Sequence, residues 1–78
     1  MNNLEVIAIM ANDRMKREAF HFNGEVILAK NQETDATLIS MYAYPRLKMF
    51  VLEQPKKPSY RCYSLQEAVE ALLIAINS

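Results

Sequence analysis

The chain has 78 residues, of which 51% are hydrophobic, with one Gly and three Pro. This composition excludes intrinsic disorder, and the nine basic and nine acidic residues cancel, which excludes a globally basic nucleic-acid binder. We expect residues 1–78 to form a single α+β domain, whose small core makes oligomerisation a common source of extra stability.

The cysteine and histidine counts exclude two further classes of protein. A single cysteine, Cys62, cannot form an internal disulfide, and one Cys with one His is too few for a four-ligand zinc site. The start MNNLEVIAIM lacks the basic region of a signal peptide, and no apolar stretch approaches the roughly 20 residues of a membrane span. We therefore expect a cytoplasmic protein with no metal, no cofactor and no membrane contact.

Residues 4–22 allow two interpretations. LEVIAIMA is typical of a buried strand that NDRM turns back into a second strand, and the β-branched Val6, Ile7 and Ile9 favour this prediction. The alternative is one long helix from residue 4 to residue 22, because nothing breaks a helix before Gly24. The apolar residues that support this helix recur every three or four positions: Leu4, Ala8, Ala11, Met15, Ala19 and Phe22.

FHFNGEVIL predicts a β-hairpin around Asn23 and Gly24, since this pair suits a two-residue type I′ turn. Such a turn pairs Phe22 with Glu25. The predicted core face then carries Phe20, Phe22, Ile27 and Ala29. The predicted second face carries Arg17, Ala19, His21, Val26, Leu28 and Lys30.

The middle of the chain reads as strands separated by loops. NQETD is a polar loop, and ATLISMYAY and RLKMFVLE are two β-rich segments around Tyr44-Pro45. QPKKPS is a loop because its prolines cannot lie inside a strand ladder, and YRCY is a short strand.

The last segment predicts a capped amphipathic helix. Ser64 is the N-cap, and Glu67 stands at the capping-box spacing. Ile74 falls between Glu67 and Glu70 on the polar side. The apolar arc contains Ala75, Ala68, Leu72, Leu65, Ile76, Val69 and Leu73.

These elements predict an α+β fold. Its antiparallel β-meander has about five or six short strands, and the C-terminal helix packs on one face. In the alternative, an N-terminal helix over residues 4–22 replaces the first two strands.

The residues predict a protein that is not an enzyme. A catalytic pair would have to use His21 as base and Cys62 as nucleophile, and the sequence offers no orienting third group or oxyanion hole for them. A half-exposed strand histidine and a small buried cysteine are the simpler interpretation.

The favoured hypothesis is a protein-interaction module, such as a regulator, inhibitor or adaptor, that acts by contact as a homodimer. The second sheet face or a strand edge would pair across a twofold axis. The candidate partner-binding residues are Ile74, Val26, Leu28, Arg17 and His21.

The alternative hypothesis is single-stranded nucleic-acid binding. Residues 46–63 contain five basic residues against Glu53, with tyrosines on both sides. Tyr rings beside cations are what single-strand binders use to stack bases and follow phosphates. The candidate residues are Tyr42, Tyr44, Arg46, Lys48, Lys56, Lys57, Tyr60, Arg61 and Tyr63.

Overall fold

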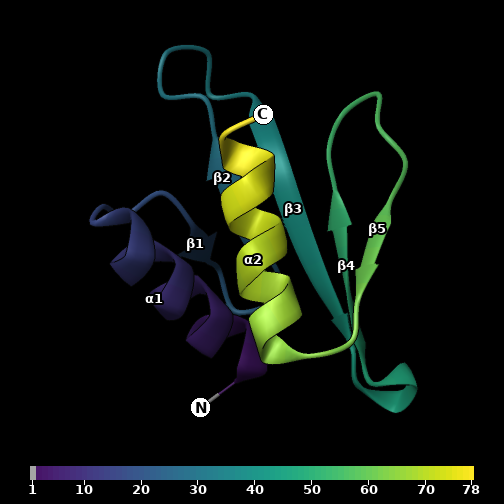
Figure 1. The fold of residues 1–78 in the computed structure, drawn as a ribbon. Coiled ribbons are helices and arrows are strands. Elements are labelled where there is room, and N and C mark those ends of the chain that lie inside the picture. Colours follow the sequence, from purple (N-terminus) through teal and green to yellow (C-terminus); the bar gives the residue numbers. More distant parts are fainter. Residues whose placement is uncertain (1) are drawn as a thin grey trace.

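The computed structural model describes residues 2–78, so Met1 lies outside the description. The elements follow in the order α1 (Asn3–Met15), β1 (His21–Phe22), β2 (Ile27–Lys30), β3 (Thr37–Tyr44), the 3-10 turn η1 (Pro45–Leu47), β4 (Met49–Glu53), β5 (Tyr60–Cys62) and α2 (Leu65–Ile76) (Figure 1). The five strands pair antiparallel with their neighbours in chain order. The predicted α+β class and antiparallel meander are confirmed.

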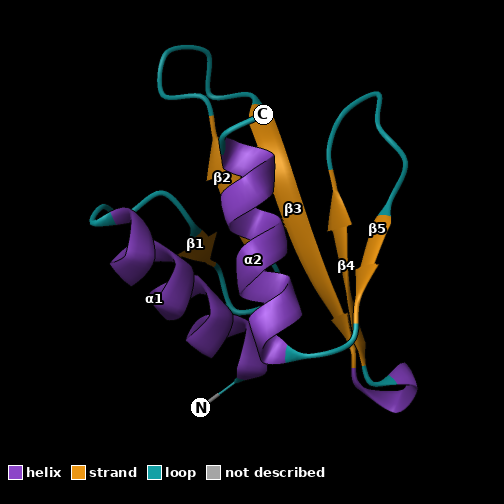
Figure 2. Ribbon diagram, in the orientation of Figure 1, coloured by secondary structure: helices purple, strands orange, loops and turns teal. Residues whose placement is uncertain are grey.

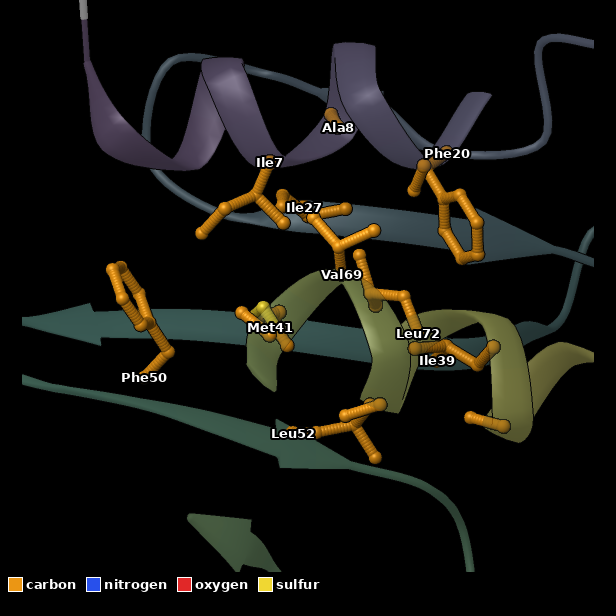
Figure 3. Packing of buried hydrophobic residues seen from close by; sticks show 14 of the residues in the cluster. Ile7, Ala8, Phe20, Ile27, Ile39, Met41, Phe50, Leu52, Val69 and Leu72 are labelled. Carbon is orange, nitrogen blue, oxygen red and sulfur yellow. The ribbon is translucent and has the colours of Figure 1, made fainter. Parts of the chain in front are cut away.

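Both helices lie on the same side of the sheet (Figure 2). α1 contacts β1, β2 and β3, whereas α2 contacts β3, β4 and β5, and the two helices contact each other. The core fills the space between these two layers. Figure 3 shows Ile7 of α1 near Ile27 of β2, and Leu72 of α2 near Ile39 of β3. The other side of the sheet is covered by neither helix.

The N-terminal segment is a helix, so the favoured strand–turn–strand prediction for it is wrong. The alternative prediction of a helix is correct, although the predicted end of this helix is not. The Asn2 side chain caps α1, its Oδ1 accepting from the Leu4 N–H at 2.8 Å. Val6 and Ile9 had favoured a strand, but Val6 is only half-buried and Ile9 is exposed. Strand propensity depends on context, and burial of one helical stripe decides here. That stripe is Leu4, Ile7, Ala8 and Ala11.

α1 ends at Met15 rather than at residue 22. Lys16 adopts the left-handed conformation with φ 61°, and its N–H bonds to the carbonyls of Asn12 and Asp13. The chain then turns back, and the Asn12 side chain bonds to both the N–H and the carbonyl of Phe20, each at 2.8 Å. This return places the Phe20 ring in the core, 3% exposed, where a continuing helix would carry it away from the sheet.

The β1–β2 hairpin forms, but with a longer loop than predicted. Phe22 pairs with Ile27 rather than with Glu25, so the loop comprises residues 23–26. Asn23 Oδ1 accepts from the backbone N–H groups of Glu25 and Val26 at 2.9 and 3.0 Å, and Gly24 has φ 101°. A shift of two positions keeps every side chain on its face. The predicted core face therefore remains correct.

The helix α2 begins as predicted. Ser64 Oγ accepts from the Glu67 N–H at 3.0 Å, while Glu67 Oε1 accepts from the Tyr63 N–H at 2.7 Å. The buried positions are Ala68, Val69, Ala71, Leu72 and Ala75. The predicted arc differs in two places, since Leu65 is 37% exposed and Ala71 is buried.

Candidate interaction surfaces

The side of the sheet away from the helices is the first candidate surface, and we call it the open face. Successive side chains of a strand point to opposite sides of the sheet. Phe50, Leu52 and Cys62 point into the core, so Val51, which lies between the first two, points the other way. Residues that pair directly share a face, so Tyr42 and Arg61, which pair with Val51, also point away from the core. By this alternation the open face carries His21, Leu28, Ser40, Tyr42, Tyr44, Val51, Glu53 and Arg61.

Val51 forms a small apolar centre on the open face. Its side chain is only 8% exposed, yet it lies outside the main core cluster. Tyr42 and Arg61 stand directly opposite it on the two neighbouring strands. Side chains at such positions are close enough to shield one another, and the Arg stem supplies apolar surface of its own. Val51 is not among the residues predicted from the sequence, although the alternation around Phe50 and Leu52 was a signal for it.

The predicted partner-binding residues fall on separate surfaces. Leu28 and His21 lie on the open face, whereas Val26 is half-buried in the loop between β1 and β2. Arg17 is in the loop after α1 and not on a strand, so its predicted place on the sheet is wrong. Ile74 lies on α2, on the helical side of the molecule, and is 69% exposed. The second predicted face also contained Ala19, which instead packs against the core.

The predicted nucleic-acid residues are also dispersed. Tyr42, Tyr44 and Arg61 share the open face. Arg46 and Lys48 belong to the η1 turn and its end, before β4 begins. They are therefore at the opposite end of β4 from Lys56 and Lys57, which lie in the loop after it (Figure 1).

The remaining two tyrosines do not join the open-face pair. Tyr60 pairs with Leu52, and by the same alternation it belongs to the helical side of β5, where it is 57% exposed. Tyr63 follows β5, is 60% exposed and donates its N–H to Glu67. The basic, tyrosine-rich segment of the sequence is thus not a single patch in the fold.

The second candidate surface is a groove between α2 and the β4–β5 hairpin, which we call the α2 groove. It has a volume of about 710 Å³. Its floor is formed by the buried residues Leu52, Ala71 and Ala75, and its walls by the exposed side chains of Tyr60 and Ile74. Tyr60, a candidate for nucleic-acid binding, and Ile74, a candidate for partner binding, therefore lie in the same groove. No local sequence pattern reveals it, because it depends on how α2 packs across the hairpin.

The structure separates His21 from Cys62. His21 lies on the edge strand β1 and on the open face, whereas Cys62 is fully buried in the core on the opposite edge strand, β5. Burial, and to a smaller extent the nearby Glu67 carboxylate, together raise the pKa of the Cys62 thiol to about 11. The thiol is therefore protonated at neutral pH and a poor nucleophile. These two residues cannot form a catalytic pair.

Within residues 2–78, no three His, Cys, Asp or Glu side chains are grouped as metal ligands would be. None of the helices in this part of the chain has the length and apolar character needed to cross a membrane. Comparison of the chain with protein-family models, curated proteins and solved structures gives no match.

Proposed function

We propose that this protein is a small non-catalytic interaction module that binds a partner protein through the open face. The observation that carries the proposal is the placement of both helices on one side of the sheet, which leaves the other side available. Leu28 and Tyr42 are partly exposed there around the buried Val51, and Tyr44 and Arg61 are exposed. Tyrosine and arginine are enriched in protein interfaces and dominate their binding energy.

The charge of the open face defines the chemistry of the partner. Arg61 is exposed, and the nearby Glu53 already accepts a hydrogen bond from Ser59 Oγ at 3.4 Å. A guanidinium binds a carboxylate in a two-pronged geometry that other cations cannot reproduce. The partner we propose has an apolar centre with a carboxylate at its rim. The reduced, buried Cys62 supports a cytoplasmic location for this module.

Single-stranded nucleic acid is the second candidate ligand for the same face. The observation in its favour is that Tyr42, Tyr44 and Arg61 share one side of the sheet, so that bases would stack on the rings while the cation contacts phosphate. The distribution of charge favours the protein partner instead. Lys56 and Lys57 lie in the loop beyond the end of β4, and the chain as a whole is neutral.

Affinity capture from the source cells, with and without nuclease, tests both candidates. We expect the wild-type chain to retain a protein after nuclease treatment. The double variant Tyr44→Ser with Arg61→Glu should lose that protein, because it removes an exposed ring and reverses the charge at the edge of the face. Its circular dichroism should remain unchanged, since both side chains are exposed.

Lys56→Glu is the matched control, since it also reverses an exposed charge but lies in the β4–β5 loop. It should capture the protein as well as the wild type does. Equal capture by the open-face variant would overturn the proposal. A signal removed by nuclease would instead support the second candidate, and binding to a labelled oligonucleotide should then weaken steeply with salt.

A further inference from the structure

The α2 groove lies on the helical side of the molecule and is not part of the open face. Ile74 is 69% exposed and Tyr60 is 57% exposed, and both stand beside a buried floor that includes Ala71. The exposed Ile74 projects beside the space above Ala71. In a self-complementary contact, the Ile74 side chain of one molecule would fill this space in another. The groove therefore raises the question of what fills it.

The two ends of the α2 groove carry opposite charges. Glu67 and Glu70 line the end near the start of α2, and the helix contains no Lys or Arg. At the other end lies Lys57, whose Nζ is 3.4 Å from Ser78 Oγ. Glu70 already pairs with Arg14 at 2.6 Å, which leaves Glu67 as the carboxylate available to an incoming cation. An occupant must therefore bring a cation to one end and an anion to the other.

We propose that a second copy of this chain fills the groove, with its α2 antiparallel to the first across a twofold axis. A twofold contact is isologous, so each surface must complement itself when reversed. Reversing the groove places the Lys57 end of one copy against the Glu67 end of the other. The charges of the groove meet this condition without any other protein.

The helical register of this pairing follows from the same symmetry. We place the twofold axis beside the midpoint of residues 67–78 of each α2. Residues equally far from this midpoint then meet, so that Ile74 of each copy lies over Ala71 of the other and Ser78 lies opposite Glu67. A large side chain thus meets a small one, which suits the distance of about 8–10 Å between the axes of two packed helices. The antiparallel arrangement also places each helix start beside the other helix end, which is favourable for the helix dipoles.

The dimer leaves both open faces directed away from the contact, so it presents two copies of the surface assigned above to the partner. The inference does not depend on that assignment, because it rests on α2 and the β4–β5 hairpin alone. The two proposals also have separate readouts. The dimer is measured by mass and the proposed function by capture through the open face.

Size-exclusion chromatography with light scattering, from low to high micromolar concentration, tests the dimer. The wild type should reach twice the 9.0 kDa mass of one chain. Ile74→Glu should remain a monomer with unchanged circular dichroism. Ile9→Glu is the matched control, because Ile9 is also an exposed helical isoleucine, at 53%, but lies on α1 away from the groove. It should dimerise as the wild type does.

Charge reversal gives a second test that does not depend on Ile74. Lys57→Glu and Glu67→Lys should each weaken the dimer roughly tenfold, since each replaces two symmetric attractions by two repulsions. The double variant should recover most of the wild-type affinity. The folding stability of Glu67→Lys must be measured alongside, because this carboxylate also accepts from the Tyr63 N–H.

Three outcomes would overturn the inference. The first is a wild-type chain that stays at 9.0 kDa throughout. The second is a dimer that Ile74→Glu and the single charge reversals leave intact, which would move the contact to the open face or a strand edge. The third is a monomeric wild type whose Ile74→Glu variant loses a captured protein, which would assign the groove to a different chain.

Discussion

At the scale of single residues, Asn12 connects the first helix to the sheet. It is the one buried polar side chain among residues 2–78, at 7% exposed. Its Nδ2 donates to the Phe20 carbonyl and to Glu18 Oε2, and its Oδ1 accepts from the Phe20 N–H. One amide thus satisfies both backbone groups of Phe20. This role is invisible in the sequence, where NDRM reads as a turn, because it depends on the path of the chain after α1.

Replacement of Asn12 by Ala should destabilise the fold by about 2–6 kcal/mol. The substitution leaves a buried N–H and a buried carbonyl of Phe20 without partners, and each such group costs about 1–3 kcal/mol. Urea unfolding measures the loss. Asp13→Ala, at the exposed neighbouring position, is the control and should change stability by no more than about 0.5 kcal/mol. Equal effects of the two substitutions would show that the Asn12 amide contributes nothing specific.

At the scale of elements, the sequence predicted most where the signal is local. The capping pair Ser64 and Glu67 located the start of α2, and the prolines located the loop between β4 and β5. The hairpin register was wrong by two positions, yet its buried face was right, because a shift of two does not exchange faces.

The prediction failed where two local patterns compete. The segment from Leu4 to Met15 has both the β-branched residues of a strand and the spacing of a helix. Contact with α2 and the sheet decides between them, and this information is not local. The α2 groove was beyond sequence reasoning for the same reason. Of the residues that line the groove, Ile74 was predicted to be exposed, and this exposure is confirmed.

A contrast within α2 tests the assignment of its buried and exposed sides. Leu72 is fully buried against the core, so Leu72→Ala should cost about 2–5 kcal/mol. Total stability for a domain of this size is about 5 kcal/mol or somewhat more, so this variant should be partly unfolded. Ile74→Ala, at an exposed position of the same helix, should change the stability of the monomer by about 0.5 kcal/mol or less. Thermal and urea unfolding at low protein concentration give both values.

At the scale of the whole molecule, the fold has two sides with different properties. The helical side contains the α2 groove with its opposed charges, while the other side is an open sheet with an apolar centre at Val51. The sequence showed a basic segment over residues 46–63, but the fold spreads those charges over both ends of β4 and over β5. A net charge along the sequence therefore does not describe a surface. Because of this division, the proposed dimer contact and the proposed binding face do not compete for the same surface.

If two chains pair through the α2 groove, stability must depend on protein concentration. Only the folded chain dimerises, so mass action favours folding as concentration rises. Once the dimer is populated, each tenfold increase adds up to about 0.7 kcal/mol per chain, half of the 1.4 kcal/mol for a factor of ten in an equilibrium constant. For a domain of this size, that raises the melting temperature by about 3–5 °C. Scanning calorimetry at several concentrations should show this rise for the wild type and Ile9→Glu but a constant value for Ile74→Glu. A wild-type melting temperature that does not change with concentration would mean that the chain folds and functions as a monomer, with the groove open to solvent.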